Sequence, residues 1–245
     1  MMLVIILLII ILFCLLNINK FTETPLKRRK ILIISAENRT EDFIKLHDTN
    51  FTKYCKIHGY EYLRLNNCLP EESSTYWCKI HKVKQGLSTG KYDYVMWCDS
   101  DTIITNYQIS LDYFINKINE PDIIIGTDFY KNTNNILCAG VFLIKNSEIG
   151  KSFINDCLNE ISKKPWCIKD NKEQGPWAGE CYEQGVMNEL IKSNKYNNVF
   201  IDSEQLFIVT RLSNTPSEFY NKIGFILHLS GLDNNYRSSI FKNYL

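Results

Sequence analysis

Short apolar runs alternate with amphipathic segments along most of the chain. The run Ile31–Ile34 and the alternating segment Tyr60–Leu65 predict two strands. Between them, apolar residues recur at helical spacing from Phe43 to Ile57. Thr40 is placed to cap this helix and Gly59 to end it. We therefore expect the order strand, helix, strand at the start of the domain.

The same alternation continues to the end of the chain. The further predicted strands are Tyr92–Cys98, Ile123–Ile125, Val141–Ile144, Val199–Ile201, Leu206–Val209 and Phe225–Leu229. The further predicted helices are Thr75–Leu87, one capped by Ser110, one capped by Ser147, and Glu180–Lys192 after a polar loop over Trp166–Gly179. Strands that alternate with helices indicate an α/β fold, with a Rossmann-like, mainly parallel sheet and helices on both of its faces.

The first residues of the chain form a different kind of segment. Residues 1–16 carry no charge, and a helix of that length rises about 24 Å, so an extension through Phe21 would span a hydrocarbon core of about 30 Å. We expect a single-pass membrane anchor over 1–21, a basic linker over 22–30 and one catalytic domain over 31–245. A cleaved signal peptide is the alternative, although no Lys or Arg precedes the run. The basic residues 27–30 favour a cytoplasmic domain, so the orientation stays open.

Net charge and cysteine content bear on which ligands the sequence predicts. The formal net charge is +1, so no global field favours nucleic acid. Nine cysteines are present, and the eight in the domain allow about 105 pairings. Cys78 and His81 have the spacing of metal ligands, but no second pair of the right kind follows, so we do not expect a zinc site there. The sequence gives no indication of oligomeric state.

The most informative segment is an apolar strand that ends in two carboxylates, Asp99 and Asp101. In open α/β sheets, ligands bind at the carboxyl ends of the strands. Two acids at such a place repel each other, and a divalent cation such as Mn²⁺ or Mg²⁺ would compensate for this repulsion. A strand followed by a solvated acidic turn is the simpler alternative.

Two later features have candidate chemistry. His228 follows the apolar run Phe225–Leu227 and precedes a turn that contains Gly231, and a neutral imidazole is a suitable third ligand for Mn²⁺. Glu183 and Gln184 follow a loop that holds two Trp residues, and their side chains can hydrogen-bond sugar hydroxyls. For His228, the alternative is a purely structural role. For Glu183, the alternative is a solvated acid in the first helical turn that interacts favourably with the helix dipole.

Taken together, these segments resemble the galactosyl- and mannosyl-transferase family numbered glycosyltransferase family 34. The matching stretches follow in order: Tyr54–Tyr60, Trp77–Ile80, Tyr92–Asn106, Ala139–Ser147, Glu183–Gln184 and His228–Gly231. The chain departs from the family pattern at Cys138, where Asn is usual, and at Glu183, where Asp is frequent.

The resemblance implies a GT-A fold and a site for each component of the reaction. Asp99, Asp101 and His228 would hold Mn²⁺ (or Mg²⁺) against the donor diphosphate, and Glu183 with Gln184 would form the catalytic pair. The nucleotide-diphosphate sugar would contact residues near several strand ends, namely Ser35, Ala36, Glu37, Arg39, Trp77, Lys79, Asp99, Ser100, Gly140 and Gly231. Arg237 is a looser candidate for the diphosphate.

The function implied is metal-dependent, retaining transfer of a sugar from a nucleotide sugar to a hydroxyl of a glycan or glycoprotein. An anchored enzyme of this family is expected in a Golgi or endoplasmic-reticulum membrane. Two alternatives stay open: a metal-dependent nucleotidyltransferase that uses the same acid pair, and a non-catalytic carbohydrate-binding protein with a decayed site.

Overall fold

A computed structural model of the chain describes residues 27–67, 74–127, 137–210 and 224–245. The expected membrane anchor over 1–21, and the linker up to residue 26, lie outside these ranges. Within the described ranges, every helix is too short or too polar to cross a membrane.

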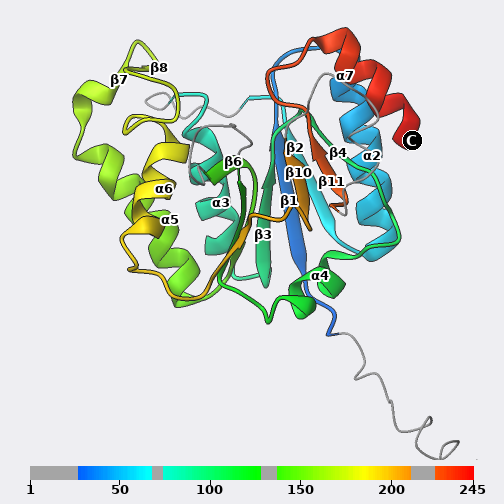
Figure 1. Cartoon of the computed structure of the whole chain (residues 1–245), viewed down its shortest axis with the longest axis horizontal. Helices are drawn as coiled ribbons and strands as arrows, with labels where there is room; N and C mark the ends of the chain where they lie inside the picture. The colour runs from blue at the N-terminus through cyan, green and yellow to red at the C-terminus, as the bar shows by residue number, and fades with distance from the viewer. Residues whose placement is uncertain (1–26, 68–73, 128–136, 211–223) are drawn as a thin grey trace, which may run out of the picture.

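A six-stranded sheet forms the centre of the molecule (Figure 1). Its strands, in spatial order, are β2 (Glu61–Leu65), β1 (Ile31–Ala36), β3 (Tyr94–Cys98), β6 (Leu137–Lys145), β5 (Ile123–Thr127) and β9 (Val199–Asp202). Strand β1 pairs in parallel with β2 and β3, and β5 pairs in parallel with β9, whereas β6 is antiparallel to both of its neighbours. The predicted α/β fold with a mainly parallel sheet is confirmed.

Helices cover both faces of this sheet (Figure 1). The helices are α2 (Asp42–His58), α3 (Cys78–Ser88), α4 (Leu111–Lys117), α5 (Glu148–Ser162), α6 (Glu183–Lys192) and α7 (Asn234–Phe241), with short 3₁₀ turns at Pro165–Cys167 and Lys242–Tyr244. Along β3, Val95 and Trp97 pack with the layer of α3, α5 and α6, while Tyr94 and Met96 pack with the layer of α2 and α4. This alternation is the period of two that a strand buried on both faces requires.

A second, three-stranded sheet lies over the α2 side of the domain. It contains β10 (Ile208–Thr210), β11 (Ile226–His228) and β4 (Thr102–Ile104), in that order. Strand β11 is parallel to β10 and antiparallel to β4. Strand β4 was not predicted, and it forms because the chain just after Asp101 pairs with a segment more than a hundred residues later. A small hairpin of β7 (Ile168–Lys169) and β8 (Lys172–Glu173) lies within the region predicted to be loop.

Several helix ends test the predicted capping residues. Gly59 ends α2 in a left-handed conformation with φ 75°, as predicted. Ser110 and Ser147 accept hydrogen bonds from backbone N–H groups three residues later, as predicted. The prediction for Thr40 is wrong, because α2 begins one residue later and Glu41 occupies the N-cap. Helices α3 and α6 each begin three residues later than predicted because turns precede them, and α7 was not predicted.

One of the cysteine pairings is defined by the described residues. Cys167 and Cys181 form a disulfide that closes the loop between the 3₁₀ turn and α6. Cys78 is also disulfide-bonded. The thiols unpaired within the described ranges are all buried, at Cys55, Cys98, Cys138 and Cys157.

Candidate active site

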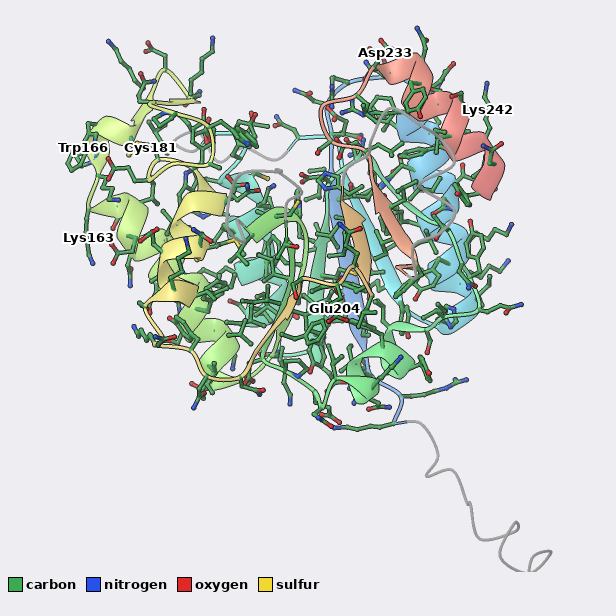
Figure 2. All side chains as sticks on the ribbon, viewed as in Figure 1. Lys163, Trp166, Cys181, Glu204, Asp233 and Lys242 are labelled. Atoms are coloured by element: carbon green, nitrogen blue, oxygen red, sulfur yellow. A yellow bond between two sulfur atoms is a disulfide. The ribbon has the colours of Figure 1, made fainter. Side chains whose placement is uncertain are left out.

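A cavity of about 850 Å³ opens where β1 and β3 end and β6 begins. It lies between the loop that carries Trp177 and the segment Ser230–Leu232 before α7. Figure 2 shows these two sides through the labelled Cys181, at one side of the molecule, and Asp233, at the other. Twelve of the residues expected at the site line this cavity: Ala36, Glu37, Arg39, Lys79, Asp99, Ser100, Asp101, Gly140, Glu183, Gln184, His228 and Gly231.

Two residues expected to contact the nucleotide sugar, Ser35 and Trp77, are absent from the described lining of the cavity. Ser35 is fully buried and shares its strand face with Ile31 and Ile33, which pack toward α2. Trp77 is a core residue, and its indole N–H donates to the Cys181 carbonyl oxygen at 3.0 Å. Strand alternation turns the Ser35 side chain away from the cavity, and core packing does the same for Trp77.

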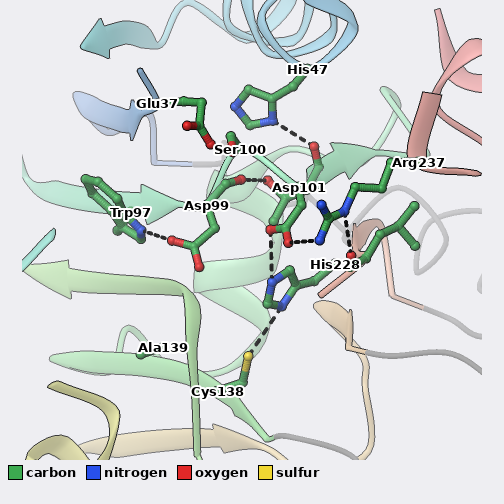
Figure 3. Close-up of polar contacts among 12 residues, drawn as sticks. Glu37, His47, Trp97, Asp99, Ser100, Asp101, Cys138, Ala139, His228 and Arg237 are labelled. Atoms are coloured by element: carbon green, nitrogen blue, oxygen red, sulfur yellow. Dashed lines mark hydrogen bonds and ion pairs between the residues drawn. The ribbon is translucent and has the colours of Figure 1, made fainter. Parts of the chain in front are cut away.

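The two carboxylates and the late imidazole meet at one end of the cavity (Figure 3). Asp99 follows β3, Asp101 precedes β4, and His228 is the last residue of β11. Because β11 pairs with β4 so that His228 faces Thr102, the imidazole lies beside Asp101. Its Nε2 is 3.2 Å from Asp101 Oδ1. One ligand atom from each of the three residues lies within 4.8 Å of the others.

The surroundings of this group fit a divalent cation. Asp101 Oδ1 is buried, and His228 Nε2 lies 3.2 Å from it, so a cation that displaced the imidazole proton could bind both atoms. The other oxygen, Oδ2, accepts a hydrogen bond from Arg237 at 3.0 Å. The His228 ring lies directly on the Gly140 backbone, since a Cβ there would be 2.2 Å from the imidazole Cε1. Two carboxylates and one imidazole form a donor set that Mn²⁺ accepts.

The pKa values of Asp101 and His228 depend on each other. Burial by itself would raise the pKa of Asp101, but the contacts with His228 and Arg237 lower it below its ordinary value. Burial would lower the pKa of His228, whereas Cys138 and Asp101 raise it above its ordinary value. Without a cation, the structure therefore favours a proton on the imidazole. A bound cation would replace that proton, because only the neutral ring can ligate.

The second nitrogen of the imidazole faces a thiol. His228 Nδ1 is 3.4 Å from Cys138 Sγ, and both side chains are buried. When Nδ1–H donates to the sulfur, the lone pair of Nε2 points toward Asp101. Cys138, which takes the place of the Asn usual in the family, can thus hold the ring in the tautomer that ligation requires.

Lys79 links the acidic pair to the predicted catalytic residues. Its buried ammonium lies 3.2 Å from Asp99 Oδ1 and 3.0 Å from Glu183 Oε1, and it donates to the Ala139 carbonyl oxygen at 3.2 Å. Gln184 Oε1 accepts the Ala139 N–H at 3.0 Å. Burial raises the pKa of Glu183, and Lys79 opposes that rise. Glu183 Oε2 and Gln184 Nε2 are buried without a hydrogen-bond partner in the described part of the chain, so both are available to a ligand.

A carboxylate at the end of β1 forms another polar wall. Glu37 Oε2 accepts a hydrogen bond from the Ser100 hydroxyl at 2.8 Å, and Oε1 accepts one from Arg39 Nε at 2.9 Å. Burial opposes ionisation, but these hydrogen bonds prevail and lower the pKa of Glu37 to about 2. Glu37 is therefore ionised at neutral pH and can accept hydrogen bonds from hydroxyl groups of a ligand.

The structure adds residues that the sequence did not assign. Arg237, only a loose candidate before, reaches Asp101 from α7 and also donates to the Leu229 carbonyl oxygen at 3.0 Å. Tyr76 and Trp177 line the cavity. The signal that could have found Arg237 is the Asp233 N-cap, which fixes the start of α7 one turn before the guanidinium.

Comparison with known proteins gives a family match for the first part of the described domain. Residues 27–125, which include Glu37, Lys79 and the acidic pair, match the model of the galactosyl transferase GMA12/MNN10 family. The chain is similar to "Probable glycosyltransferase 6" of Oryza sativa subsp. indica, with 30% identity over 111 residues. It is also similar to "Galactomannan galactosyltransferase 1" of Cyamopsis tetragonoloba, with 27% identity over 110 residues.

These two matches cover 43% of the present chain and about a quarter of the relatives, 23% and 25% of their respective lengths. The fold extends further than the sequence match. A glycosyltransferase involved in glycosylation of the major capsid of PBCV-1 superposes with a TM-score of 0.64 at 16% identity, covering 87% of this chain and 99% of that one. The apo form of the glycosyltransferase GlyE of Streptococcus pneumoniae TIGR4 gives 0.51 at 13% identity, covering 89% and 60%. The chain therefore has the GT-A fold that the family resemblance implied.

Proposed function

We propose that the protein is a metal-dependent, retaining glycosyltransferase. It moves a sugar from a nucleotide-diphosphate sugar to a hydroxyl of a glycan or glycoprotein acceptor. The observation that carries the proposal is the meeting of Asp99, Asp101 and His228 at one end of a large cavity in a GT-A fold. The available oxygen of Glu183 and the available amide of Gln184 line the same cavity.

Asp99, Asp101 and His228 would hold the cation, Mn²⁺ or Mg²⁺. When bound, it supplies electrostatic neutralisation of the charge that develops on the leaving diphosphate. Arg237 neutralises one oxygen of Asp101 and leaves the other available, so it orients this carboxylate toward the cavity. Arg237 is therefore a positioning residue, which differs from the direct diphosphate contact first considered for it.

The residues at the end of β1 are suited to the nucleotide. Ionised Glu37 accepts hydrogen bonds from hydroxyls such as those of a ribose, and half-exposed Arg39 offers positive charge to a phosphate. Gly140 and Gly231 also line the cavity. Gly140 lets the backbone approach the imidazole and, in the proposal, the donor sugar.

Glu183 and Gln184 would act at the reacting carbon. Lys79 holds one oxygen of Glu183, so the other faces the sugar and stabilises positive charge that develops at the anomeric carbon. The bond from this carbon to the diphosphate oxygen breaks while the acceptor oxygen bonds on the same face, and the acceptor proton passes to the leaving phosphate. Retention follows from attack on that face.

The proposal also includes the rest of the chain and its location. Residues 1–21 would anchor the enzyme in a secretory membrane of Golgi or endoplasmic-reticulum type, 22–30 would be the linker, and 31–245 the GT-A domain. Support comes from the uncharged run 1–16 and from the family resemblance. Relatives named for galactosyl and xylosyl transfer favour a hexose or pentose donor.

The test is nucleotide release by the full-length chain in detergent. It would be incubated with Mn²⁺ and UDP-galactose, UDP-xylose, UDP-glucose or GDP-mannose, with and without an acceptor glycan, and with EDTA as a control. The expected product is free nucleoside diphosphate, lost on chelation. Release of pyrophosphate in a parallel incubation with UTP and galactose 1-phosphate would instead identify a nucleotidyltransferase. The absence of any turnover, with glycan binding intact, would identify a carbohydrate-binding protein.

A further inference from the structure

Three aromatic rings form a cluster on the cavity wall beside Glu183. The ring centroids of Tyr76, Trp177 and Tyr182 lie 5.1 to 5.3 Å apart, and each pair meets edge to face. Tyr76 and Trp177 line the cavity, and Tyr182 directly precedes Glu183 in the chain. Trp177 is 52% exposed, so filling the core does not account for this large side chain.

The loop that carries Trp177 is held in place by two separate contacts. The disulfide between Cys167 and Cys181 closes it. Its backbone also packs against the first turn of α6, where a Cβ on Gly185 would lie 2.0 Å from the Gly179 carbonyl oxygen. The indole is therefore presented by a braced loop, which reduces the entropy that a ligand would lose in ordering it.

The charges near the rings discriminate between ligands. Burial is the main cause that raises the pKa of Tyr76; the charges of Glu173 and Glu183 add to the rise, and Lys79 opposes it. Lys79 is already paired with Glu183 at 3.0 Å, and a diphosphate or an acidic sugar at the rings would require a positive partner. A neutral pyranose suits the cluster better. Its C–H face can lie on an aromatic ring, whose face carries partial negative charge, while its hydroxyl rim stays in contact with water and polar groups.

We propose that Tyr76, Trp177 and Tyr182 form an acceptor subsite that stacks a neutral pyranose ring of a glycan next to Glu183. This assignment rests on the proposed transferase function of the cavity. The indole of Trp177 makes the main contact, and the two tyrosines fix its orientation through their edges. The acceptor enters from the solvent side of the cavity, and the donor occupies the side formed by the strand ends.

The test measures saccharide binding and donor turnover separately. Calorimetry on the full-length chain in detergent would use the neutral hexasaccharides cellohexaose and mannohexaose as probes. The variants are Trp177→Ala and Trp177→Phe, with Trp166→Ala as the matched control, because Trp166 is 62% exposed and does not belong to the described cavity lining. Trp177→Ala should weaken binding about tenfold or more, Trp177→Phe less than about threefold, and Trp166→Ala not at all. In the control Trp166→Ala, nucleotide release without acceptor should also be unchanged.

Three outcomes would overturn the acceptor subsite. They are wild-type affinity in Trp177→Ala, a loss of donor-only nucleotide release in that variant with saccharide binding intact, or no saturable binding of either hexasaccharide by the wild-type chain. Failure of the proposed function looks different. In that case no nucleotide sugar is turned over, yet hexasaccharide binding still depends on Trp177, and the rings remain a glycan site. Equal thermal unfolding midpoints of the variants would exclude misfolding.

Discussion

The two walls of the cavity are built by different means. On one wall, which we call the strand wall, Asp99, Asp101 and His228 lie at the ends of strands, and the pairing of β4 with β11 sets their separation. On the other, which we call the loop wall, Trp177 lies on a loop that a disulfide and a close glycine contact hold in place.

This difference matches the two tasks of the cavity. The reacting groups need fixed positions, whereas the residues that recognise a ligand can vary. Strand register leaves little freedom, because a slip by one residue would turn every side chain to the other face of the sheet. A loop can change in length and sequence without disturbing the sheet. The family match follows this division in part, since it includes the acidic pair but ends at residue 125, well before Trp177.

The strongest test of the strand wall is Asp101→Asn. The variant keeps the shape of the side chain but removes the charge that the cation requires. We expect turnover to fall at least about 100-fold, which corresponds to about 2.7 kcal/mol of transition-state stabilisation. Nucleotide release would measure it, with the exposed Asp170→Asn in the β7–β8 turn as a control that keeps wild-type activity. Unchanged turnover in Asp101→Asn would remove the metal assignment.

The loop wall is best tested at Gly185. A Cβ there would meet two backbone carbonyls, at 2.0 and 2.5 Å, and backbone cannot move aside cheaply. Gly185→Ala should lower the free energy of unfolding by about 1 to 3 kcal/mol and weaken saccharide binding. Chemical denaturation and calorimetry would measure these changes. Mn²⁺ affinity should stay near that of the wild type, and a large drop in it would show that the two walls are not independent.

Gly140→Ala is the matched change on the strand wall. The new methyl group would occupy the place of the His228 ring, 2.2 Å from Cε1, so the imidazole must move away from the carboxylates. We expect Mn²⁺ affinity to fall about tenfold or more, as it does when the groups that orient a ligand are lost. Titration followed by electron paramagnetic resonance would measure the loss. Saccharide binding at Trp177 should not change, the reverse of the Gly185→Ala result.

The pH dependence of metal binding tests His228 directly. Its pKa is raised above the ordinary value in the cation-free protein, so Mn²⁺ must displace a proton. Affinity should therefore rise with pH, by up to about tenfold per pH unit below that pKa, and then level off. In His228→Gln this contribution should be absent, leaving a flatter profile. A profile identical to that of the wild type would contradict the ligand role.

The smallest expected effect concerns Glu37. Its pKa falls from 4.5 to about 2 on folding, so the ionised form is stabilised in the native state. This contribution is fully present above pH 4.5 and is lost as pH falls from 4.5 toward 2. Because Arg39 is half-exposed, we expect the contribution of Glu37 ionisation to the free energy of unfolding to be below about 1 kcal/mol. Urea unfolding of Glu37→Gln should show a shallower loss of stability over that interval, and an unchanged slope would contradict the assignment.

The sequence was sufficient for most of the fold and for much of the site. Strands β1, β3 and β5 are continuous apolar runs, and this pattern reports burial on both faces. The position of Asp99 and Asp101 after such a strand located the cavity, because parallel strands end at one edge of the sheet. The sequence also placed His228 at the end of an apolar run, and the structure brings its ring beside Asp101 although β11 belongs to the smaller sheet.

The features that were missed depend on long-range contacts. Strand β4 has three residues, and its strand conformation comes from pairing with β11. Helix α7 is rich in Asn and Ser, with few apolar residues to mark its period, and it is stabilised by packing against α2 through contacts such as that of Phe43 with Phe241. The disulfide between Cys167 and Cys181 is one of many pairings, and sequence spacing does not select it.

Strand β6 runs against its neighbours in the central sheet, so its first residues arrive where β3 departs. The Gly140 carbonyl oxygen accepts the Asp99 N–H at 2.8 Å, and the Ala139 peptide groups hold Lys79 and Gln184. These connections are made by main-chain atoms, which substitution of a side chain does not delete. Exchange of the Ala139 side chain would therefore leave these main-chain contacts in place, whereas exchange of Cys138 would remove its contact with the His228 ring.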